Sequence, residues 1–371
     1  MNKISIILLS FFLTLGSCAF ALPTEKKTES SHYQEDQQIC SPTECYTIVK
    51  KLGEGAFGEV FEVTDSQGNE FALKTYKSRE GDWADGNIFS DPEREFLRGQ
   101  ELNHPYIIRS YDLFFHESPE NIQTQNLILE LVKGKTVSST LKGTLPVDNA
   151  MMNAFQLCEA LYHGITFDLI HFDLHDGNVM LTNEGEVKVI DLASFFTFSE
   201  ILEAFGNLEP VPEKQYYTDK NSNMTHISAK AGIATKQLQP QNAFRMAKLQ
   251  KIFKGNPELM TQMQKAKAAV QRQTALNRFG ALSASSKSES IYIDPVEIYK
   301  VHFLKYYFHL VTEICARFIS KSELSREERL KLRAEVKKVA WHYEEDLEDG
   351  IIMPIDHYFK NLSDFLQYSP L

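Results

Sequence analysis

Polar side chains suited to group transfer lie in and just after a short loop between two apolar runs. Asp173 and Asn178 belong to this loop, and Asp191 comes at the end of the second apolar run. A carboxylate can orient an attacking hydroxyl and accept its proton, and carboxylate and amide oxygens are the ligands that Mg²⁺ prefers. Asp173 is therefore a candidate base, and Asn178 and Asp191 are candidate metal ligands, for the transfer of a group such as a phosphoryl to a hydroxyl.

A glycine-rich segment upstream has the composition of a phosphate-binding loop. Gly53, Gly55 and Gly58 lie between two β-rich runs, and Val60 completes the pattern G-x-G-x-x-G-x-V. Because glycine has no Cβ, the backbone can approach phosphate oxygens and bond to them through its N–H groups. The glycines alone would also fit a dinucleotide fold, where a strand leads into a helix. Strand-like alternation on both sides favours a hairpin over the nucleotide instead.

A lysine follows on the next expected strand. The turn signal Gly68-Asn69 leads into residues 70–74, which end with Lys74. A lysine considered by itself is most often a surface residue. On an apolar strand behind a phosphate loop, Lys74 becomes a candidate for binding the α- and β-phosphates.

These motifs, in this order, resemble the eukaryotic-type protein kinase family. Residues 71–74, Phe-Ala-Leu-Lys, are similar to the V-A-I-K motif of that family. Residues 171–178 are similar to its H-R-D-L-x-x-x-N loop, and Asp191 is similar to the aspartate of D-F-G. The resemblance covers about residues 47–195 well and the rest poorly. It implies ATP and Mg²⁺ as cofactors and a serine/threonine-protein kinase that transfers the γ-phosphoryl group to protein hydroxyls.

The resemblance also implies an α+β fold with two lobes. Residues 46–133 would form a small β-rich N-terminal lobe, and residues 134–371 a larger helical C-terminal lobe with divergent C-terminal helices. Apolar periodicity predicts helices over residues 146–167, 241–280, 295–320 and 324–346. The basic residues of the second of these helices are expected on a solvated face, with binding of an anionic partner as the alternative. Cys158 and Cys315 lie in helical patterns and are expected in the core.

The resemblance assigns roles to individual residues. Lys74 would pair with Glu95 of a helix that starts after an N-cap at Asp91, with Glu93 as the alternative partner. His171 would brace the catalytic loop. The residues that the resemblance places around the nucleotide are Gly53, Gly55, Gly58, Val60, Ala72 and Lys74, with Leu129, Glu130 and Val132 at the adenine.

Two departures from the family pattern bear on regulation and on the acceptor. Phe172 replaces the Arg of H-R-D, which in that family binds a phosphorylated activation loop, so we expect activity that does not depend on phosphorylation of residues 194–213. The segment from Asp173 to Asn178 is closer to the D-L-H-x-G-N of aminoglycoside and choline phosphotransferases. A protein substrate is the first expectation, a small-molecule acceptor is the alternative, and a pseudokinase scaffold is the third.

The first 21 residues have the features of a secretory signal peptide. Lys3 supplies a positive charge, residues 4–15 form an apolar run, and Ala19-Phe20-Ala21 is an A-x-A cleavage pattern. A lipoprotein signal that ends at Cys18 is the alternative. We expect an exported protein, secreted or periplasmic. Because ATP is scarce outside cells, a secreted effector that acts inside a host cell is one expectation.

A polar segment, residues 22–45, is expected to link the signal peptide to the first lobe. It contains Cys40 and Cys45, which could form a disulfide in an oxidising compartment. The spacing of the two cysteines permits this bond without requiring it.

Composition excludes several classes of protein. Of the 371 residues, 43% are hydrophobic and 11% aromatic, which excludes disorder over most of the length. The net charge of −11 opposes binding to nucleic acid or to an anionic membrane surface. After residue 21 no run reaches about 18 uninterrupted apolar residues, so no membrane span is expected. No feature of the sequence sets the oligomeric state.

Overall fold

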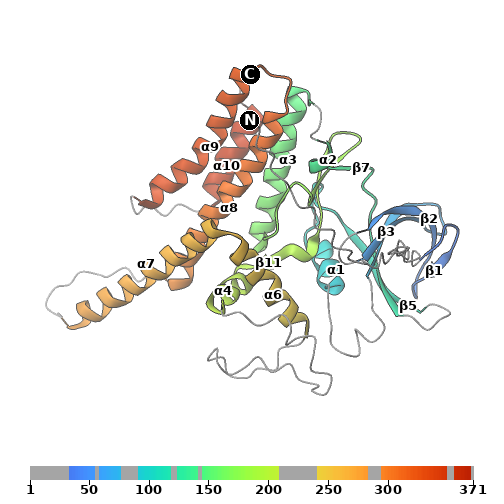
Figure 1. Cartoon of the computed structure of the whole chain (residues 1–371), viewed down its shortest axis with the longest axis horizontal. Helices are drawn as coiled ribbons and strands as arrows, with labels where there is room; N and C mark the ends of the chain where they lie inside the picture. Colours follow the sequence, from blue (N-terminus) through green and yellow to red (C-terminus); the bar gives the residue numbers. More distant parts are fainter. Residues whose placement is uncertain are drawn as a thin grey trace, which may run out of the picture. The chain divides into compact units, whose positions relative to one another are not determined.

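The described part of the chain is an α+β structure. The computed structural model describes residues 33–54, 58–76, 91–117, 123–140, 144–208, 240–282, 294–348 and 355–368. All of them belong to one compact unit, residues 33–371. Strands dominate its N-terminal part and helices its C-terminal part, as the sequence predicts (Figure 1).

Six antiparallel strands form the sheet of the N-terminal part, in the order β1-β2-β3-β4-β6-β5. The strands are β1 (Gln38–Cys40), β2 (Cys45–Glu54), β3 (Gly58–Thr64), β4 (Glu70–Tyr76), β5 (Ser110–Glu117) and β6 (Gln123–Glu130). Buried residues alternate along β3, so one face of the sheet covers a core that includes Phe61, Leu73 and Ile128. The turn expected before β4 is present, and the Asp65 side chain accepts the N–H of Asn69 at 2.8 Å.

Residues 33–45 pack against this sheet and add strand β1 to it, which corrects the expected linker over residues 22–45. Tyr33 is buried, and its hydroxyl shares a hydrogen bond of 2.7 Å with Thr124 of β6. β1 then pairs with β2. A few buried side chains fix a segment whose composition is mostly polar. The residues before 33, which include the expected signal peptide, lie outside the described part of the chain.

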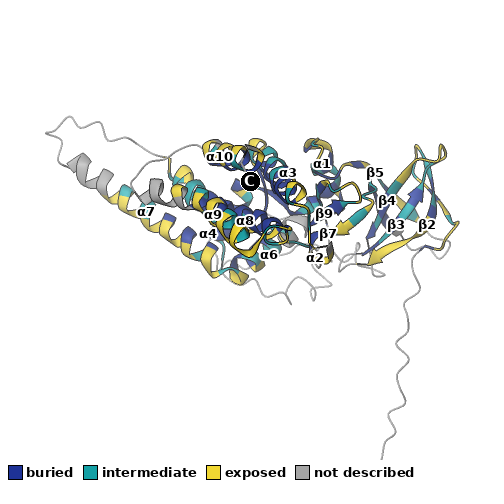
Figure 2. Cartoon of the chain, turned by 90° about the horizontal axis from the view of Figure 1, so that it is seen from above, coloured by how far each residue is buried: buried dark blue, intermediate teal, exposed yellow. Residues whose placement is uncertain are grey.

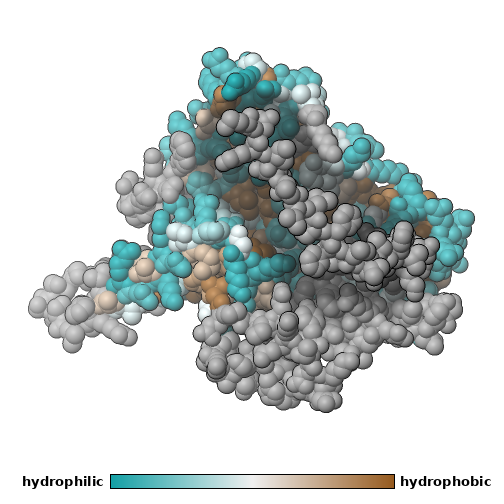
Figure 3. All heavy atoms as spheres, viewed as in Figure 1, coloured by the Kyte–Doolittle hydropathy of each residue, from teal (hydrophilic) through white to brown (hydrophobic). Residues whose placement is uncertain are grey.

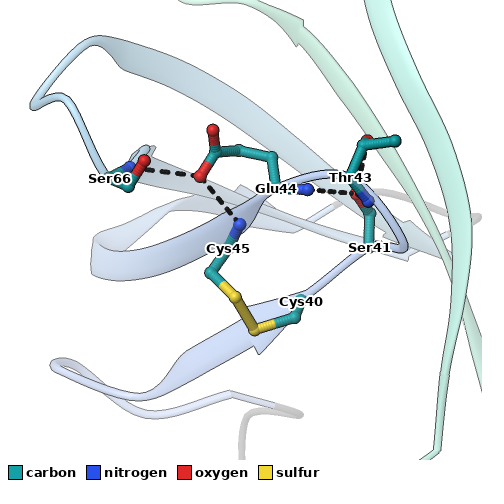
Figure 4. The surroundings of a disulfide bond; sticks show 6 residues. All are labelled: Cys40, Ser41, Thr43, Glu44, Cys45 and Ser66. Atoms are coloured by element: carbon teal, nitrogen blue, oxygen red, sulfur yellow. Dashed lines mark hydrogen bonds between the residues drawn. A yellow bond between two sulfur atoms is a disulfide. The ribbon is translucent and has the colours of Figure 1, made fainter.

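A disulfide between Cys40 and Cys45 closes the turn from β1 to β2, as the sequence allowed (Figure 4). The Glu44 carboxylate accepts hydrogen bonds from the backbone N–H groups of Cys45 and Ser66. Ser41 Oγ accepts the N–H of Glu44 at 3.1 Å. Hydrogen bonds within the turn therefore support the covalent link.

Helix α1 (Pro92–Glu101) packs against β5 and carries Glu95. The Asp91 side chain caps the helix by accepting the N–H of Arg94 at 3.2 Å. Pro92 stands in the first turn, where the missing N–H leaves no hydrogen bond unmade. This start confirms the helix start predicted from the sequence.

Helix α3 lies at the centre of the C-terminal part, packed against α8 and α10. The helices are α2 (Val137–Thr140), α3 (Val147–Thr166), α4 (Phe198–Gly206), α6 (Pro240–Gly255), α7 (Pro257–Leu282), α8 (Pro295–Ser320), α9 (Arg326–Glu348) and α10 (Ile355–Tyr368). Cys158 of α3 and Cys315 of α8 are buried, which confirms their predicted place in the core. The predicted helix over 241–280 divides at Asn256, and α10 was not predicted from the sequence.

Short strands position the loops of the C-terminal part. They form two sheets, of β7 (Gly134–Thr136), β9 (Val179–Thr182) and β10 (Val187–Val189), and of β8 (Leu169–His171) and β11 (Phe195–Thr197). The loop with Asp173 joins β8 to β9, and Asp191 precedes the single turn η1 (Leu192–Ser194). Because β9 pairs with β10 and β8 with β11, antiparallel pairing brings this loop and Asp191 together.

The surface of the described part is largely hydrophilic on the face shown in Figure 3. Exposed residues run along much of α7, whereas buried residues gather along α3 and α8 (Figure 2). Within the ranges that the structure describes, no helix combines the length and the apolar character needed to cross a membrane.

Candidate active site

Lys74 of β4 forms an ion pair with Glu95 of α1. Its Nζ donates to Glu95 Oε2 at 2.6 Å, and the Tyr76 hydroxyl donates to the same oxygen at 2.6 Å. The Glu95 side chain is 3% exposed, whereas Glu93 is exposed. Burial opposes the charged form of Lys74, but the carboxylates of Glu95 and Asp191 outweigh this effect and raise the pKa of Lys74. The lysine therefore stays cationic, paired with Glu95 and favoured by the charge of Asp191.

Four residues expected at the nucleotide share one face of the sheet. Val60 lies opposite Lys74 across β3 and β4, and Ala72 lies opposite Leu129 across β4 and β6. Ala72 and Lys74 are alternate residues of β4, so their side chains point to the same face, and directly opposite partners also share a face. The other face covers the Phe61 core. Three apolar side chains and one ammonium group thus line one surface, which is the chemistry that an adenine and its phosphates need.

In the phosphate loop, the packing of the strands requires glycine at Gly58 but leaves room for a side chain at Gly53. Gly53 lies opposite Val60, and no atom lies within 4 Å of the position of a Cβ there. At Gly58 a Cβ would lie 1.8 Å from the Thr75 carbonyl oxygen, so the pairing of β3 with β4 itself requires glycine. Gly55 lies outside the described residues.

The segment after β6 is the one expected to meet the adenine. The Glu130 N–H donates to the Arg109 carbonyl oxygen at 2.9 Å, and the Glu130 carboxylate pairs with Lys188 at 2.5 Å. Val132 is half-buried and packs against the main core. These contacts fix the course of the segment. The Glu130 carbonyl and the Val132 backbone remain the groups predicted to bond to the adenine.

Hydrogen bonds join the catalytic loop to the residue before Asp191. Asn178 Nδ2 donates to the Asp173 carbonyl oxygen at 2.8 Å, and the Ile190 N–H donates to the Asn178 carbonyl oxygen at 3.0 Å. The ring of His171 is buried, with Nε2 at 3.0 Å from the Ile190 carbonyl oxygen. Burial lowers the pKa of His171, so the neutral ring places its proton on Nε2 and donates it to that oxygen. Asp173 and Asn178 are thus held beside Asp191.

Asp191 lies among two cations and a hydroxyl group. Its backbone is left-handed, with φ of 61°, a conformation that aspartate tolerates better than most residues. Ser194 Oγ donates to Asp191 Oδ2, and Lys248 Nζ lies 3.6 Å from the same oxygen. Burial works to raise the pKa of Asp191, but Lys248, Lys74 and the Ser194 hydrogen bond outweigh it and lower the pKa. The carboxylate is therefore ionised.

The range that holds these residues matches a known family. A family model described as the protein kinase domain matches residues 46–206. Residues 46–206 belong to the protein kinase family. The kinase domain contains each site residue described above except Lys248, and the match ends before α6.

The relatives of the kinase domain carry protein kinase names. The chain is 31% identical over 155 residues to serine/threonine-protein kinase PknA of Mycobacterium tuberculosis, which covers 39% of this chain and 34% of that protein. It is 28% identical over 180 residues to serine/threonine-protein kinase 10 of Danio rerio, which covers 46% of this chain and 17% of that protein. It is 27% identical over 149 residues to probable serine/threonine-protein kinase glkA of Dictyostelium discoideum, which covers 40% of this chain and 29% of that protein. The chain spans about a third or less of the length of these relatives.

Two oxygen donors of the kinase domain could hold Mg²⁺. Asn178 uses its amide nitrogen for the Asp173 carbonyl, which leaves the amide oxygen as the ligand atom, and Asp191 offers an ionised carboxylate. Among the residues that the structure describes, no group of three or more His, Cys, Asp or Glu side chains could hold a metal ion. This donor set fits Mg²⁺, which binds through one or two protein oxygens together with phosphate oxygens and water.

Arg94 attaches helix α1 of the kinase domain to α4. Its guanidinium forms a bidentate ion pair with Glu200, with both N–O distances at 2.8 Å, and donates to the Phe195 carbonyl oxygen. Arg94 is 5% exposed and is the neighbour of Glu95 in sequence. Glu200 therefore positions the helix that carries the partner of the site lysine. Sequence reasoning missed this pair, because no motif relates two charged residues so far apart in the chain.

Among the described basic residues expected on a solvated face, Lys251, Lys254, Lys265, Lys267 and Arg272 are exposed as predicted, but Lys248 of α6 is not. It contacts Asp191 and donates to Ser194 Oγ, whereas Lys251 on the same helix is exposed as predicted. Ser194 is buried and was not predicted as a site residue. The periodicity of α6 identifies a helix but does not reveal which distant carboxylate one of its lysines meets.

Proposed function

We propose that this protein is an ATP-dependent serine/threonine-protein kinase that transfers the γ-phosphoryl group of Mg·ATP to protein hydroxyls. The observation that carries the proposal is the Lys74–Glu95 ion pair on the sheet face that Val60 and Leu129 share, where the charge of Asp191 also favours the cationic lysine. The names of the relatives support protein hydroxyls as the acceptor.

The residues of the site divide the work of phosphoryl transfer. Lys74, held by Glu95, would bind the α- and β-phosphates. Mg²⁺ held by Asn178 and Asp191 would supply the positive charge that neutralises the phosphate oxygens. Asp173 would orient the acceptor hydroxyl and take up its proton. Because contacts within the protein hold these groups, positioning and charge neutralisation account for most of the expected rate enhancement.

A small-molecule phosphotransferase is the second candidate, and one local observation favours it. His175 Nδ1 accepts the N–H of Gly177 at 3.0 Å, and a Cβ on Gly177 would lie 2.7 Å from the His175 ring. The His-x-Gly pair is thus one packed unit, and it belongs to the segment that is similar to the D-L-H-x-G-N of aminoglycoside and choline phosphotransferases. A pseudokinase scaffold ranks third, because the residues that the chemistry needs are present in the sequence.

Incubation with γ-labelled ATP separates these candidates. The protein is mixed with Mg²⁺ and, in parallel reactions, with a generic protein substrate, an aminoglycoside or choline. Label on Ser or Thr of the protein substrate supports the proposal, and label on a small molecule alone supports the second candidate. No label in any reaction contradicts both and leaves the scaffold. Asp173→Ala serves as the control, because label that persists in this variant comes from a contaminating kinase.

We further propose that the protein is exported and works inside another cell. The apolar run and the A-x-A pattern in residues 1–21 support export, and the Cys40–Cys45 disulfide supports passage through an oxidising compartment. Because ATP is scarce outside cells, a recipient cell would supply the nucleotide. Mass spectrometry of protein from the culture medium should find an N-terminus near residue 22. Protein found only in the producing cell, with Met1 intact, would contradict export.

A further inference from the structure

Helix α6 lies beyond the matched kinase domain, yet it brings a lysine to the aspartate proposed to bind metal. Lys248 Nζ lies 3.6 Å from Asp191 Oδ2 and donates to Ser194 Oγ at 2.7 Å. Ser194 in turn donates its hydroxyl proton to the same Asp191 oxygen. An ammonium, a hydroxyl and a carboxylate thus contact one another in a closed group.

Contacts on both sides of Lys248 hold it in this position. Arg245, about one turn earlier on α6, pairs with Asp91 at the start of α1. Gln250, on the other side, donates to the Asn207 carbonyl oxygen at the end of α4. The Lys248 side chain is only 18% exposed. The lysine is therefore part of the packed structure rather than a surface residue that meets Asp191 by chance.

The surroundings of Asp191 make its carboxylate depend on the contact with Lys248. The Asp191 side chain is 23% exposed, and a carboxylate with so little solvent needs a partner of opposite charge. Lys74 is already paired with Glu95, and among the described residues it is Lys248 that forms an ion pair with Asp191. Mg²⁺ on the same carboxylate would bring two further positive charges beside the ammonium, and like charges at such distances repel strongly.

We propose that Lys248 is a positioning residue for the metal site: it holds the Asp191 carboxylate, directly and through Ser194, until Mg²⁺ replaces it as the ionic partner. The inference rests on the proposed function, because it takes Asp191 as a metal ligand. It gives α6, a helix outside the family match, a part in metal binding.

Thermal unfolding of the full chain, without nucleotide or acceptor, tests this inference. With a chelator present, Lys248→Met should lower the melting temperature by about 3–8 °C, because Asp191 loses its partner. Mg²⁺ titrated to saturation should restore most of this loss and should bind the variant at least about tenfold more tightly than the wild type. Lys248→Arg keeps the charge and should behave as the wild type does. Lys251→Met, on the exposed side of the same helix, is the matched control.

Two results would overturn the inference. One is an unchanged melting temperature in Lys248→Met, and the other is a loss that Mg²⁺ does not restore, which would mark a purely structural lysine. If Lys248→Met does not fold, the comparison moves to Asp191→Asn, where no carboxylate needs a partner. When Lys248→Met is added to Asp191→Asn, the melting temperature should not fall further. A further loss of several degrees would also overturn the inference.

The thermal-unfolding test of Lys248 and the labelling test of kinase activity can fail separately. A labelled acceptor without Mg²⁺ rescue of Lys248→Met would remove only the role of Lys248. Mg²⁺ rescue without label on any acceptor would remove only the proposed kinase activity.

Discussion

Lys74 and Glu95 are two charged side chains held together where little water reaches them. The ammonium donates to Glu95 at 2.6 Å, and the Tyr76 hydroxyl satisfies the same carboxylate oxygen. A poorly solvated charge that loses its partner costs roughly 3–5 kcal/mol, so each side chain fixes the other. The pair therefore sets the position of Nζ before any phosphate arrives, which is what catalysis by positioning requires.

Three substitutions at the site should each lower turnover by orders of magnitude without unfolding the protein. Asp173→Ala removes the proton acceptor, Asp191→Ala removes a metal ligand, and Lys74→Ala removes the cation expected at the phosphates. Each should lower kcat/KM by about 10²–10⁴-fold, measured as initial rates of label transfer. Circular dichroism checks the fold, and Lys50→Ala, on the exposed side of β2, is the control. Rates close to the wild type in all three variants would defeat the assignment of the site.

His104 should make the protein less stable as the pH falls below 6.5. Burial first, and then the charges of His163 and Lys188, lower the pKa of His104 from 6.5 to about 4. The unfolded chain protonates His104 near pH 6.5, whereas the folded chain does so only near pH 4. The stability that the neutral ring contributes is therefore fully present above pH 6.5 and is lost as the pH falls from 6.5 to 4. The loss should reach about 1–2 kcal/mol, after allowance for partial exposure.

The variant His104→Asn tests this assignment. Asparagine keeps an acceptor for the Tyr106 N–H, which now donates to His104 Nδ1 at 3.3 Å, but it does not titrate. Urea unfolding from pH 7 to pH 4 should give a flatter profile for the variant than for the wild type. Parallel profiles would assign the acid sensitivity to other groups.

The carboxylate of Glu200 holds helix α1 through its ion pair with Arg94 and, unlike a phosphate group, needs no modification of the chain. Glu200 binds Arg94 from α4 through two charge-assisted hydrogen bonds. Phe172, where the family has the Arg of H-R-D, packs against Phe253 and Phe303 in the core and binds no phosphate. The Arg94–Glu200 ion pair thus links α1 to α4 without any phosphate group.

Loss of the Glu200 charge should loosen α1. Glu200→Gln keeps the size of the side chain but leaves the buried Arg94 guanidinium with neutral acceptors, so the free energy of unfolding should fall by about 1–3 kcal/mol. The KM for ATP should rise, because Glu95 is held less firmly. Denaturant unfolding and initial rates measure the two effects, and Glu203→Gln, exposed on the same helix, is the matched control. Wild-type stability together with a wild-type KM would show that the ion pair does not position α1.

Activity should not depend on phosphorylation of the segment after Asp191. Two of its hydroxyl residues already serve the fold, because Ser194 donates to Asp191 and Thr197 caps α4. Ser199 is exposed, and Ser199→Ala should keep the rate within about twofold of the wild type, as should phosphatase treatment of the enzyme. A loss of activity in either case, with the fold intact, would point to a regulatory phosphate.

Across the whole molecule, prediction from the sequence succeeded where a local pattern determines the structure. Asp91 followed by proline marks the start of α1, and apolar periodicity gives α3 and α8 within a residue or two. It failed where the partner is distant: Lys248 meets Asp191 from another helix, and Glu200 meets Arg94. Charge, spacing and composition describe one segment at a time, and only the folded chain decides which buried charges become partners.

The N-terminal boundary of the folded unit is the clearest case, and it can be tested. The family match begins at residue 46, but Tyr33 and Ile39 are buried in the same core cluster as Phe61. A chain that begins at residue 46 should expose this cluster and melt about 5–15 °C below a chain that begins at residue 33, because it loses two large buried side chains and β1. Thermal unfolding of the two chains in the same buffer measures the difference. Equal melting temperatures would show that residues 33–45 do not stabilise the kinase domain, and that its sheet is complete without them.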